Sequence, residues 1–202
     1  MSIQSNHNWN HSADIVVVGS GAGALTAALV AAIDGASVLI LEKGEHYGGT
    51  SATSGGGLWL PDNHLMRAAG MQDSVEEAMQ YLLALTRQDV APELVRAFVE
   101  HGPAMLRFLE ERTHVRYEAM LHYADYYQEL PGAKPGGRSI DPLPYDGRLL
   151  GEEFLRMQPS HVQTTVMGLM GYTNLEGAVL LSKAPGWLKV VAGLALRYSS
   201  DF

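Results

Sequence analysis

Cysteine is missing from all 202 residues of this sequence. Its absence excludes disulfide bonds, thiolate nucleophiles and cysteine-based zinc sites, and it favours a protein of the reducing cytoplasm. Histidine does not take over as a metal ligand, because the eight histidines are scattered and form no paired motif with acidic residues. We therefore expect no metal site.

Basic residues are scarce as well. Lys and Arg total 14 against 22 Asp and Glu, which gives a formal net charge of −8. Binding to nucleic acid or to an anionic membrane surface needs a basic patch, so neither is expected as a partner. The sequence also lacks a Gly-x-Ser-x-Gly elbow and a Walker phosphate loop, and so offers no support for a hydrolase or an NTPase.

Long uninterrupted apolar runs are absent too. The most apolar stretch, 15–33, is broken by glycines at 19, 21 and 23, so we expect no membrane span. Residues 1–13 are polar, which argues against a secretory signal and predicts a disordered tail. A hydrophobic content of 47% with 18% charged residues is nevertheless enough for a folded core. A soluble, cytoplasmic protein is expected.

The first informative feature is a glycine-rich turn between a strand and a helix. Residues 14–18 predict a strand buried on both faces, 25–33 a helix, and 37–41 a second buried strand. The turn GSGAGA at 19–24 and the acidic Glu42 about twenty residues beyond it complete the spacing of a dinucleotide-binding βαβ unit. An ordinary βαβ turn is the alternative, and the motif does not separate NAD from FAD.

Each residue type in this turn has a physical reason. Gly19 permits the tight turn, Gly21 lets the backbone approach a pyrophosphate, and a small residue at Ala24 keeps the helix close to the sheet. The pyrophosphate would lie on the free amides at the start of the helix. Glu42 would accept hydrogen bonds from a ribose and would repel a 2′-phosphate, which disfavours NADP. The predicted phosphate-site residues are Gly19, Ser20, Gly21, Ala22, Gly23 and Ala24.

A second glycine-rich patch follows closely, with the sequence KGEHYGGTSATSGGGLWLP at 43–61. Glycines let backbone amides touch a flat ring, and small hydroxyl side chains offer compact hydrogen-bonding groups, so this patch suits a flavin. A flexible linker is the alternative, but Trp59 and its neighbouring leucines argue against it. The predicted contacts here are Lys43, Gly49, Thr50, Ser51, Ser54, Gly55, Gly56 and Gly57.

The run 14–63 resembles the amino-terminal part of the fumarate reductase and succinate dehydrogenase type of FAD flavoproteins. Within that group, SGGGLWLPDN at 54–63 is similar to the 3-ketosteroid Δ1-dehydrogenases. The resemblance implies that both glycine patches hold one FAD, the first at the pyrophosphate and the second at the flavin. It also implies an α/β fold in which a Rossmann-like FAD-binding βαβ unit precedes a mainly helical region, incomplete relative to the family.

Residues 64–202 are expected to form this helical region. Ser74 and Glu77 predict a capping box, Pro92 begins a second helix, and a third covers about 103–112. The portion from 151 onward is expected to be mostly helical, with an apolar stretch at 166–170 and an interruption at 174–176. Between them, 114–151 holds five tyrosines and no sustained period, which predicts an active-site loop.

One tyrosine of this loop is the candidate catalytic residue. Asp125-Tyr126-Tyr127, followed by PGAKPGGR at 131–138, resembles the segment from which the ketosteroid dehydrogenases supply an active-site tyrosine, and the match falls on Tyr126. The resemblance implies that hydride leaves C1 of a 3-oxosteroid for flavin N5 while a proton leaves C2 for a tyrosine, which Tyr126 assists. Because a free tyrosine titrates near pH ~10, a neighbour must favour its ionised form. Tyr123, Tyr127 and a plain packing role remain alternatives.

The resemblance spans nearly the whole chain but well under half of a complete family member. Our main hypothesis is the amino-terminal part of an FAD-dependent 3-ketosteroid Δ1-dehydrogenase. The alternatives are a non-catalytic FAD-binding fragment or subunit that needs a second chain, a fumarate- or urocanate-type flavin reductase, and an NAD module that would leave the second patch unexplained. A sheet with too few strands would expose apolar faces, which predicts poor solubility or a partner chain.

Overall fold

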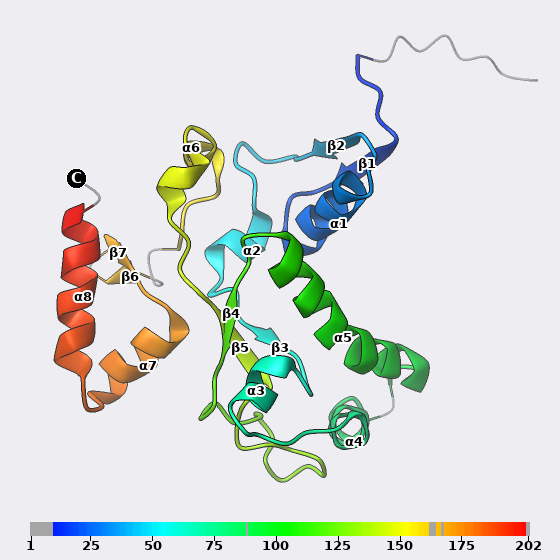
Figure 1. Ribbon diagram of the computed structural model, residues 1–202, viewed down its shortest axis with the longest axis vertical. Coiled ribbons are helices and arrows are strands. Elements are labelled where there is room, and N and C mark those ends of the chain that lie inside the picture. The colour runs from blue at the N-terminus through cyan, green and yellow to red at the C-terminus, as the bar shows by residue number, and fades with distance from the viewer. Residues whose placement is uncertain (1–9, 88, 162–164, 167, 201–202) are drawn as a thin grey trace, which may run out of the picture. The chain divides into compact units, whose positions relative to one another are not determined.

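The computed structural model describes residues 10–87, 89–161, 165–166 and 168–200 (Figure 1). The chain forms two compact units, one made of 1–54 with 146–161 and the other of 55–145 with 162–202. The polar tail predicted for 1–13 falls mostly outside the described residues. The boundary between the units falls within the second glycine patch, between Ser54 and Gly55.

The first unit contains the predicted βαβ arrangement. Strand β1 (Ile15–Val18) pairs in parallel with β2 (Val38–Leu41), and helix α1 (Ala22–Ile33) connects them. The register places Ile15 opposite Val38 and Val18 opposite Leu41. Gly19 adopts a φ of +96°, a left-handed conformation that favours glycine and that the tight turn after β1 requires.

The two strands are not buried on both faces, contrary to the expectation from their apolar runs. Val18 is 81% exposed, and Ile15, Val16, Ile40 and Leu41 are exposed as well. Within the described residues this sheet has two strands, and α1 packs against both of them, but five of the apolar side chains are left exposed. Each apolar run therefore marks a strand correctly, but in the described residues it does not mark burial on both faces.

The rest of the first unit surrounds the second glycine patch. Helix α2 (Gly49–Thr53) forms from its hydroxyl-rich residues, and the 3₁₀ helix η1 (Gly147–Leu150) and helix α6 (Glu153–Arg156) come from the later segment. Tyr47 links the two, because its amide donates to the Arg156 carbonyl at 3.0 Å and its carbonyl accepts from the Gln158 amide at 2.7 Å. The part of the patch up to Ser54 thus belongs to the first unit, in which Tyr47 fixes it to the later segment.

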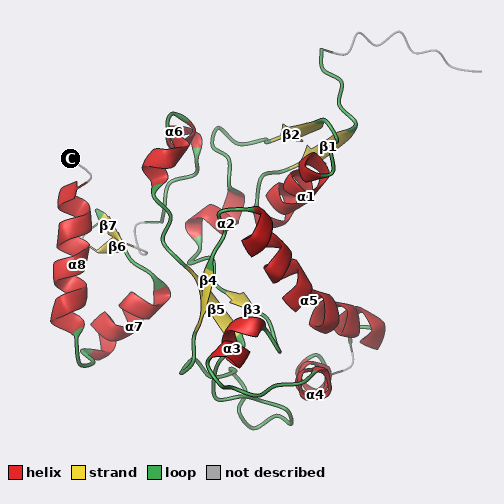
Figure 2. Cartoon of the chain, in the orientation of Figure 1, coloured by secondary structure: helices red, strands yellow, loops and turns green. Residues whose placement is uncertain are grey.

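The second unit has a three-stranded antiparallel sheet in the order β3-β5-β4 (Figure 2). Its strands are β3 (Leu58–Trp59), β4 (Tyr117–Ala119) and β5 (Ser139–Pro142), with helices α3 (His64–Ala68), α4 (Val75–Leu85) and α5 (Pro92–Arg112). Leu60, Leu106 and Ile140 form one buried cluster, while α4 and α5 form another. Strands β4 and β5 lie in the segment from which we expected only an irregular loop.

The capping of α4 and the helix start expected at Pro103 differ from the sequence predictions. Ser74 caps α4 by accepting from the Glu77 amide at 3.2 Å, but its own amide donates to Asp73 instead of closing the capping box with Glu77. Helix α5 continues through Pro103 as one helix of 21 residues. Its buried stripe, which runs from Val95 to Leu109, keeps helical spacing across the proline, and this packing outweighs the lost backbone hydrogen bond.

The carboxy-terminal portion is less helical than expected. Strands β6 (Thr165–Val166) and β7 (Met170–Gly171) form a hairpin where an apolar helix was expected. Helix α7 (Asn174–Ser182) begins at the predicted interruption, because Thr173 and Glu176 form a complete capping box. Helix α8 (Trp187–Ser200) follows. Across the described ranges, no helix is both long and apolar enough to cross a membrane.

Candidate functional site

The two glycine-rich patches are in direct contact in the first unit. The Ser51 hydroxyl accepts a hydrogen bond from the Ala22 amide at 3.0 Å, although the residues are 29 positions apart. A side chain on Gly49 would meet the Gly21 Cα at 3.5 Å. The start of α1 and the start of α2 are thereby held together, which brings predicted residues of both patches onto one surface.

The buried Ser20 side chain connects three segments of this unit by hydrogen bonds. Its hydroxyl donates to the Glu42 carboxylate and accepts from the Gly48 amide at 2.9 Å, and its side chain is buried. The sequence predicted Ser20 as a cofactor contact. The structure uses its hydroxyl within the protein, where it links the first turn, the end of β2 and the second patch.

Glu42 stands at the end of β2 as an ionised carboxylate. The Gly44 amide, which donates to it at 2.8 Å, lowers its pKa most, and the Ser20 hydroxyl lowers the pKa further. Glu42 is exposed, as is Lys43 beside it. This carboxylate could therefore accept hydrogen bonds from a ribose, as the spacing of the motif predicts.

The start of α1 has the properties that a pyrophosphate needs. The first hydrogen bond within the helix runs from the Leu25 amide to the Gly21 carbonyl at 2.9 Å, so the helix itself does not use the amides of Gly23 and Ala24. Gly21 and Gly23 carry no side chain to cover these amides, and the positive end of the helix dipole lies there. The residues present therefore fit the pyrophosphate of a dinucleotide.

The hydroxyls of α2 have mixed roles. Thr53 and Ser54 donate back to the carbonyls of Thr50 and Ser51 at 3.0 and 2.9 Å, so both hydroxyls take part in the last turn of the helix. Gly49, Thr50 and Ser51 are exposed. The exposed start of α2 is consequently the part of this helix that can contact a ligand.

Gly55, Gly56 and Gly57 lie in the second unit, where the protein itself explains the small size of the first two. A Cβ on Gly55 would lie 2.7 Å from the Asn174 Oδ1, and one on Gly56 would lie 3.0 Å from Pro142. Asn174 is held by its side-chain amide, which donates to the buried carboxylate of Asp141. Contact with flavin stays a prediction for these three glycines, and close packing gives a separate reason for Gly55 and Gly56, whereas a Cβ on Gly57 would meet its neighbours at 3.4 Å or more.

Gly55→Ala should destabilise the protein by about 1–3 kcal/mol, because its methyl group would overlap an amide that Asp141 holds in place. Asn174→Ala should remove the obstacle, so the double variant should lose less stability than the sum of the single variants. Urea unfolding of the four proteins measures the coupling. Additive losses would mean that Gly55 and Asn174 do not meet.

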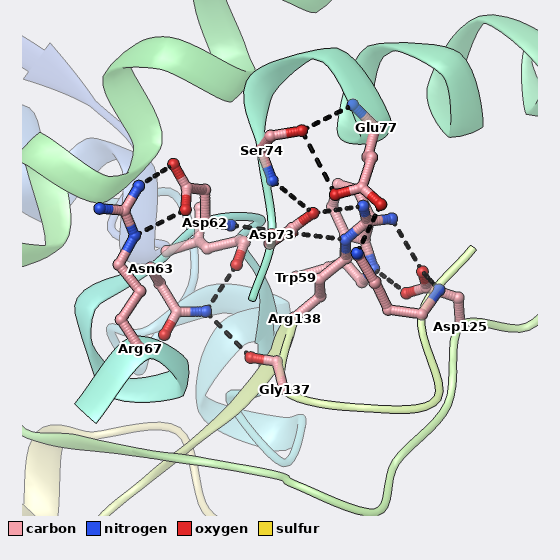
Figure 3. A network of polar contacts seen from close by, with 12 residues as sticks. Trp59, Asp62, Asn63, Arg67, Asp73, Ser74, Glu77, Asp125, Gly137 and Arg138 are labelled. Carbon is pink, nitrogen blue, oxygen red and sulfur yellow. Dashed lines mark hydrogen bonds and ion pairs between the residues drawn. The ribbon is translucent and has the colours of Figure 1, made fainter. Parts of the chain in front are cut away.

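The tyrosine segment of the second unit is held by the buried carboxylate of Asp125 (Figure 3). It accepts hydrogen bonds from the indole of Trp59 at 2.7 Å, from the Lys134 amide at 2.9 Å and from the Arg138 guanidinium at 2.9 Å. These donors come from β3 and from the loop that leads into β5. Asp125 is thus an anchor for the chain immediately before Tyr126.

Arg138 is the centre of this buried network. Its guanidinium makes two hydrogen bonds with Asp73, at 2.8 and 2.7 Å, besides the one with Asp125, and it lies 5.4 Å from the Trp59 ring centroid. Burial alone would raise the pKa of the Asp73 carboxyl, but hydrogen bonding and charge from Arg138 outweigh it and lower that pKa. The three charged side chains, which are at most 2% exposed, form a satisfied ionic triad.

Tyr126 itself points to solvent. Its side chain is 80% exposed, and its hydroxyl lies 3.2 Å from the Tyr123 hydroxyl. On its other side, the Tyr127 amide donates to the Tyr81 hydroxyl at 3.3 Å. The backbone around Tyr126 is therefore fixed on both sides, while its phenol is presented outward.

Sequence reasoning missed Asp73, Arg138 and the pairing of Tyr123 with Tyr126. Asp73 and Arg138 are 65 residues apart, and no local period connects them. The only feature of the sequence that could have pointed to Asp73 and Arg138 is that each charged residue stands beside an apolar or glycine-rich segment. In the part of the chain that the structure describes, no group of three residues could hold a metal ion.

Comparison with known proteins gives a consistent result. A family described as an FAD binding domain matches residues 14–180. The 3-oxosteroid 1-dehydrogenase of Mycobacterium tuberculosis (strain ATCC 25618 / H37Rv) is 44% identical over 148 residues, which are 73% of this chain and 26% of that protein. A 4-oxocyclohexanecarboxylate 2-dehydrogenase from Sinomonas cyclohexanicum is 50% identical over 129 residues, 64% of this chain and 22% of that protein.

A solved structure resembles nearly the whole chain. It is the 3-ketosteroid delta1-dehydrogenase from Sterolibacterium denitrificans in complex with 1,4-androstadiene-3,17-dione, with a TM-score of 0.89 and 43% identity. The match covers 94% of this chain and 34% of that one. The present chain therefore spans between about a fifth and about a third of the length of these relatives.

Proposed function

Since this chain belongs to the FAD binding domain family, we propose that it is the amino-terminal part of an FAD-dependent oxidoreductase that introduces a double bond next to a ring ketone, with 3-oxosteroids as substrates. The observation that carries this proposal is the likeness, in fold and sequence over nearly the whole chain, to a dehydrogenase solved with a steroid. The proposed reaction is 1,2-desaturation, in which C1 loses a hydride and C2 a proton.

The residues of the first unit would hold the cofactor. The free amides at the start of α1 would bind the pyrophosphate, with Gly21 leaving room for its approach, and Glu42 would bind a ribose. The exposed residues Thr50 and Ser51 at the start of α2 would contact the cofactor toward its flavin end. When bound, FAD supplies the acceptor for the hydride that leaves the substrate.

The second unit would contribute to the proton-accepting side of the reaction. The phenol of Tyr126 is exposed and its backbone is fixed by the anchored Asp125, so it can face a substrate without reorganising the loop. Its role would be to help take up the proton from C2. The remaining catalytic groups would come from parts of the protein beyond this chain.

The exposed apolar side chains on the strands of the first unit are evidence that other parts of the enzyme pack against them. Val16, Val18 and Leu41 present apolar side chains that a complete parallel sheet would bury. We infer that the rest of the enzyme covers them, either in the same polypeptide or in a second chain. The cytoplasm is the proposed compartment, which the absence of cysteine supports.

A smaller cyclic ketone is a second candidate substrate. The relative from Sinomonas cyclohexanicum named for 4-oxocyclohexanecarboxylate has the higher percentage identity, although over a shorter stretch. Its named substrate also contains a six-membered ring ketone, so the same desaturation chemistry applies.

The test uses a full-length protein that contains this chain, purified with FAD. A flavin absorption band followed by bleaching on addition of a 3-oxosteroid, and not of 4-oxocyclohexanecarboxylate, would support the steroid proposal. Bleaching by the small ketone alone would favour the second candidate. A protein that binds FAD but is bleached by neither would contradict the proposed reaction. The 202-residue chain, studied in parallel with a mass measurement in solution, shows whether FAD binding needs the remaining part.

Gly21→Ala should weaken FAD binding about tenfold or more, because the methyl group would cover the amides at the start of α1. The added Cβ would lie 3.5 Å from the Ser51 hydroxyl, an ordinary contact, so the fold should tolerate it. Equilibrium titration with FAD, followed by flavin fluorescence, measures the effect. Gly193→Ala in α8, where a Cβ meets nothing within 4 Å, is the matched control and should bind FAD normally.

A further inference from the structure

Two tyrosine hydroxyls face each other on the segment that presents Tyr126. The hydroxyls of Tyr123 and Tyr126 lie 3.2 Å apart, within hydrogen-bond distance, and their rings meet edge to face with centroids 6.1 Å apart. The two residues are three positions apart in the chain, and the turn just before them is closed by the Tyr123 amide, which donates to the Met120 carbonyl at 3.1 Å. The arrangement is therefore local and does not depend on parts of the protein beyond this chain.

Two adjacent phenols do not ionise independently. Once one has lost its proton, the other can donate a charge-assisted hydrogen bond to the resulting phenolate, and the second proton is then held more tightly. The hydrogen bond with Tyr126 is the main cause that raises the pKa of Tyr123, with burial and the charge of an ionised Tyr126 adding to it. Tyr123 is thus the partner that retains its proton.

Other charged groups near the pair are already engaged. The Asp125 carboxylate is directed to Trp59, Lys134 and Arg138, and the Arg138 guanidinium is occupied by Asp73 and Asp125. On the helix side, the Tyr81 hydroxyl receives the amide of Tyr127. His122, next to Tyr123 in the chain, is exposed. The contact that acts directly on the Tyr123 hydroxyl is therefore the one with Tyr126.

We propose that Tyr123 is a positioning residue that donates its hydroxyl hydrogen to the Tyr126 oxygen and so stabilises the phenolate form of Tyr126. The proposal rests on the proposed function, because it gives the candidate catalytic tyrosine the neighbour that a phenolic proton acceptor needs at moderate pH. Only the Tyr126 O–H bond breaks: its proton passes to solvent, while Tyr123 keeps its own O–H bond and donates the hydrogen bond.

The first test is a pH titration of the 202-residue chain labelled with ¹³Cζ-tyrosine and followed by NMR. This readout needs neither FAD nor turnover, so it decides the pairing even if the proposed function fails. In Tyr123→Phe, the ¹³Cζ chemical shift of Tyr126 should change, because its hydrogen-bond partner is lost while the ring is kept. An unchanged ¹³Cζ chemical shift of Tyr126 would overturn the proposal.

The reciprocal variant guards against a folding defect in Tyr123→Phe. In Tyr126→Phe, the pKa of Tyr123 should fall, since the hydrogen bond and charge that raise it are removed. If the Tyr123 signal does not move to lower pH, the pair is not coupled and the proposal fails. Tyr198→Phe, which removes one tyrosine from α8, serves as the control and should leave both signals unchanged.

The second test measures turnover against pH in the full-length enzyme. Tyr123→Phe should change the dependence of kcat on pH, because the hydrogen bond between the two hydroxyls is lost while the Tyr126 phenol is kept. The KM for substrate should change less than kcat at neutral pH. Steroid turnover with an identical pH profile in parent and variant would overturn the positioning role while leaving the proposed function intact.

Discussion

Tyr126→Phe in the full-length enzyme should lower kcat for 3-oxosteroid desaturation about a hundredfold or more, which is the usual range for loss of a group that assists proton transfer. The flavin absorption spectrum and FAD affinity should be unchanged, because the substitution removes one exposed hydroxyl from a backbone that the Asp125 contacts hold in place. Steady-state kinetics at the pH optimum, together with the absorption spectrum, measure both quantities.

Tyr127→Phe is the matched comparison for this experiment. Tyr127 is adjacent in the sequence, and its contact with Tyr81 uses its backbone amide, which the substitution retains. If Tyr127→Phe lost more activity than Tyr126→Phe, the assignment of the catalytic tyrosine would move to Tyr127. Near-normal turnover of Tyr126→Phe would contradict its role altogether.

Arg138→Met should have the largest effect on stability, with a loss of about 3–5 kcal/mol in the free energy of unfolding. Methionine occupies similar volume but leaves the carboxylates of Asp73 and Asp125 buried without their cation. It also removes the cation–π contacts of the guanidinium with Trp59 and Tyr81, at 5.4 and 5.7 Å from their ring centroids. Urea unfolding followed by tryptophan fluorescence measures the loss and includes a signal from Trp59.

The effect of Arg138→Met should depend on pH in a defined direction. In the parent protein the pKa of Asp73 is lowered from 3.8, because Arg138 outweighs the opposing effect of burial, so the triad stabilises the fold above that pH and loses this contribution as pH falls. In the variant the buried Asp73 carboxylate takes up a proton more readily, because Arg138 no longer opposes the effect of burial on its pKa. The stability difference between the two proteins should therefore narrow below pH ~4.

A surface ion pair offers the control for Arg138→Met. Arg96 contacts Glu100 at 3.1 Å one turn along α5, and both side chains are about half exposed. Arg96→Met should change stability by less than about 0.5 kcal/mol, with little dependence on pH. If Arg96→Met and Arg138→Met lowered the free energy of unfolding equally, the buried triad would contribute no more to stability than a surface ion pair.

The parts of this protein that could be predicted from the sequence are those in which the relevant residues are close together in the chain. The glycine turn at 19–24 required a strand before it and a helix after it, and both are present as β1 and α1. The prediction of FAD as the cofactor is confirmed by the family match, and so is the resemblance to the 3-ketosteroid dehydrogenases. The individual cofactor and catalytic residues remain predictions.

The predictions of secondary structure that failed had different causes, two of them long-range packing and one a local capping box that the sequence reading overlooked. Pro103 marked a helix start in the sequence, but the buried stripe of α5 continues across it. The segment 174–176 read as an interruption, but Thr173 and Glu176 cap the start of α7. Strand β5 lay hidden in an irregular stretch, because its pairing partners β3 and β4 are distant in the sequence.

The sequence by itself determined the dinucleotide-binding turn, its acidic strand end and the type of cofactor, because backbone conformation and residue size are local properties. Only the tertiary structure decided that Ser20 and Ser51 join the two glycine patches, that Asp73, Arg138 and Asp125 form one buried triad, and that Tyr123 meets Tyr126. Charged groups can be buried only when they are paired, and the chain satisfies that requirement with partners up to 65 residues apart. No local pattern reveals such a pairing before the fold brings the partners together.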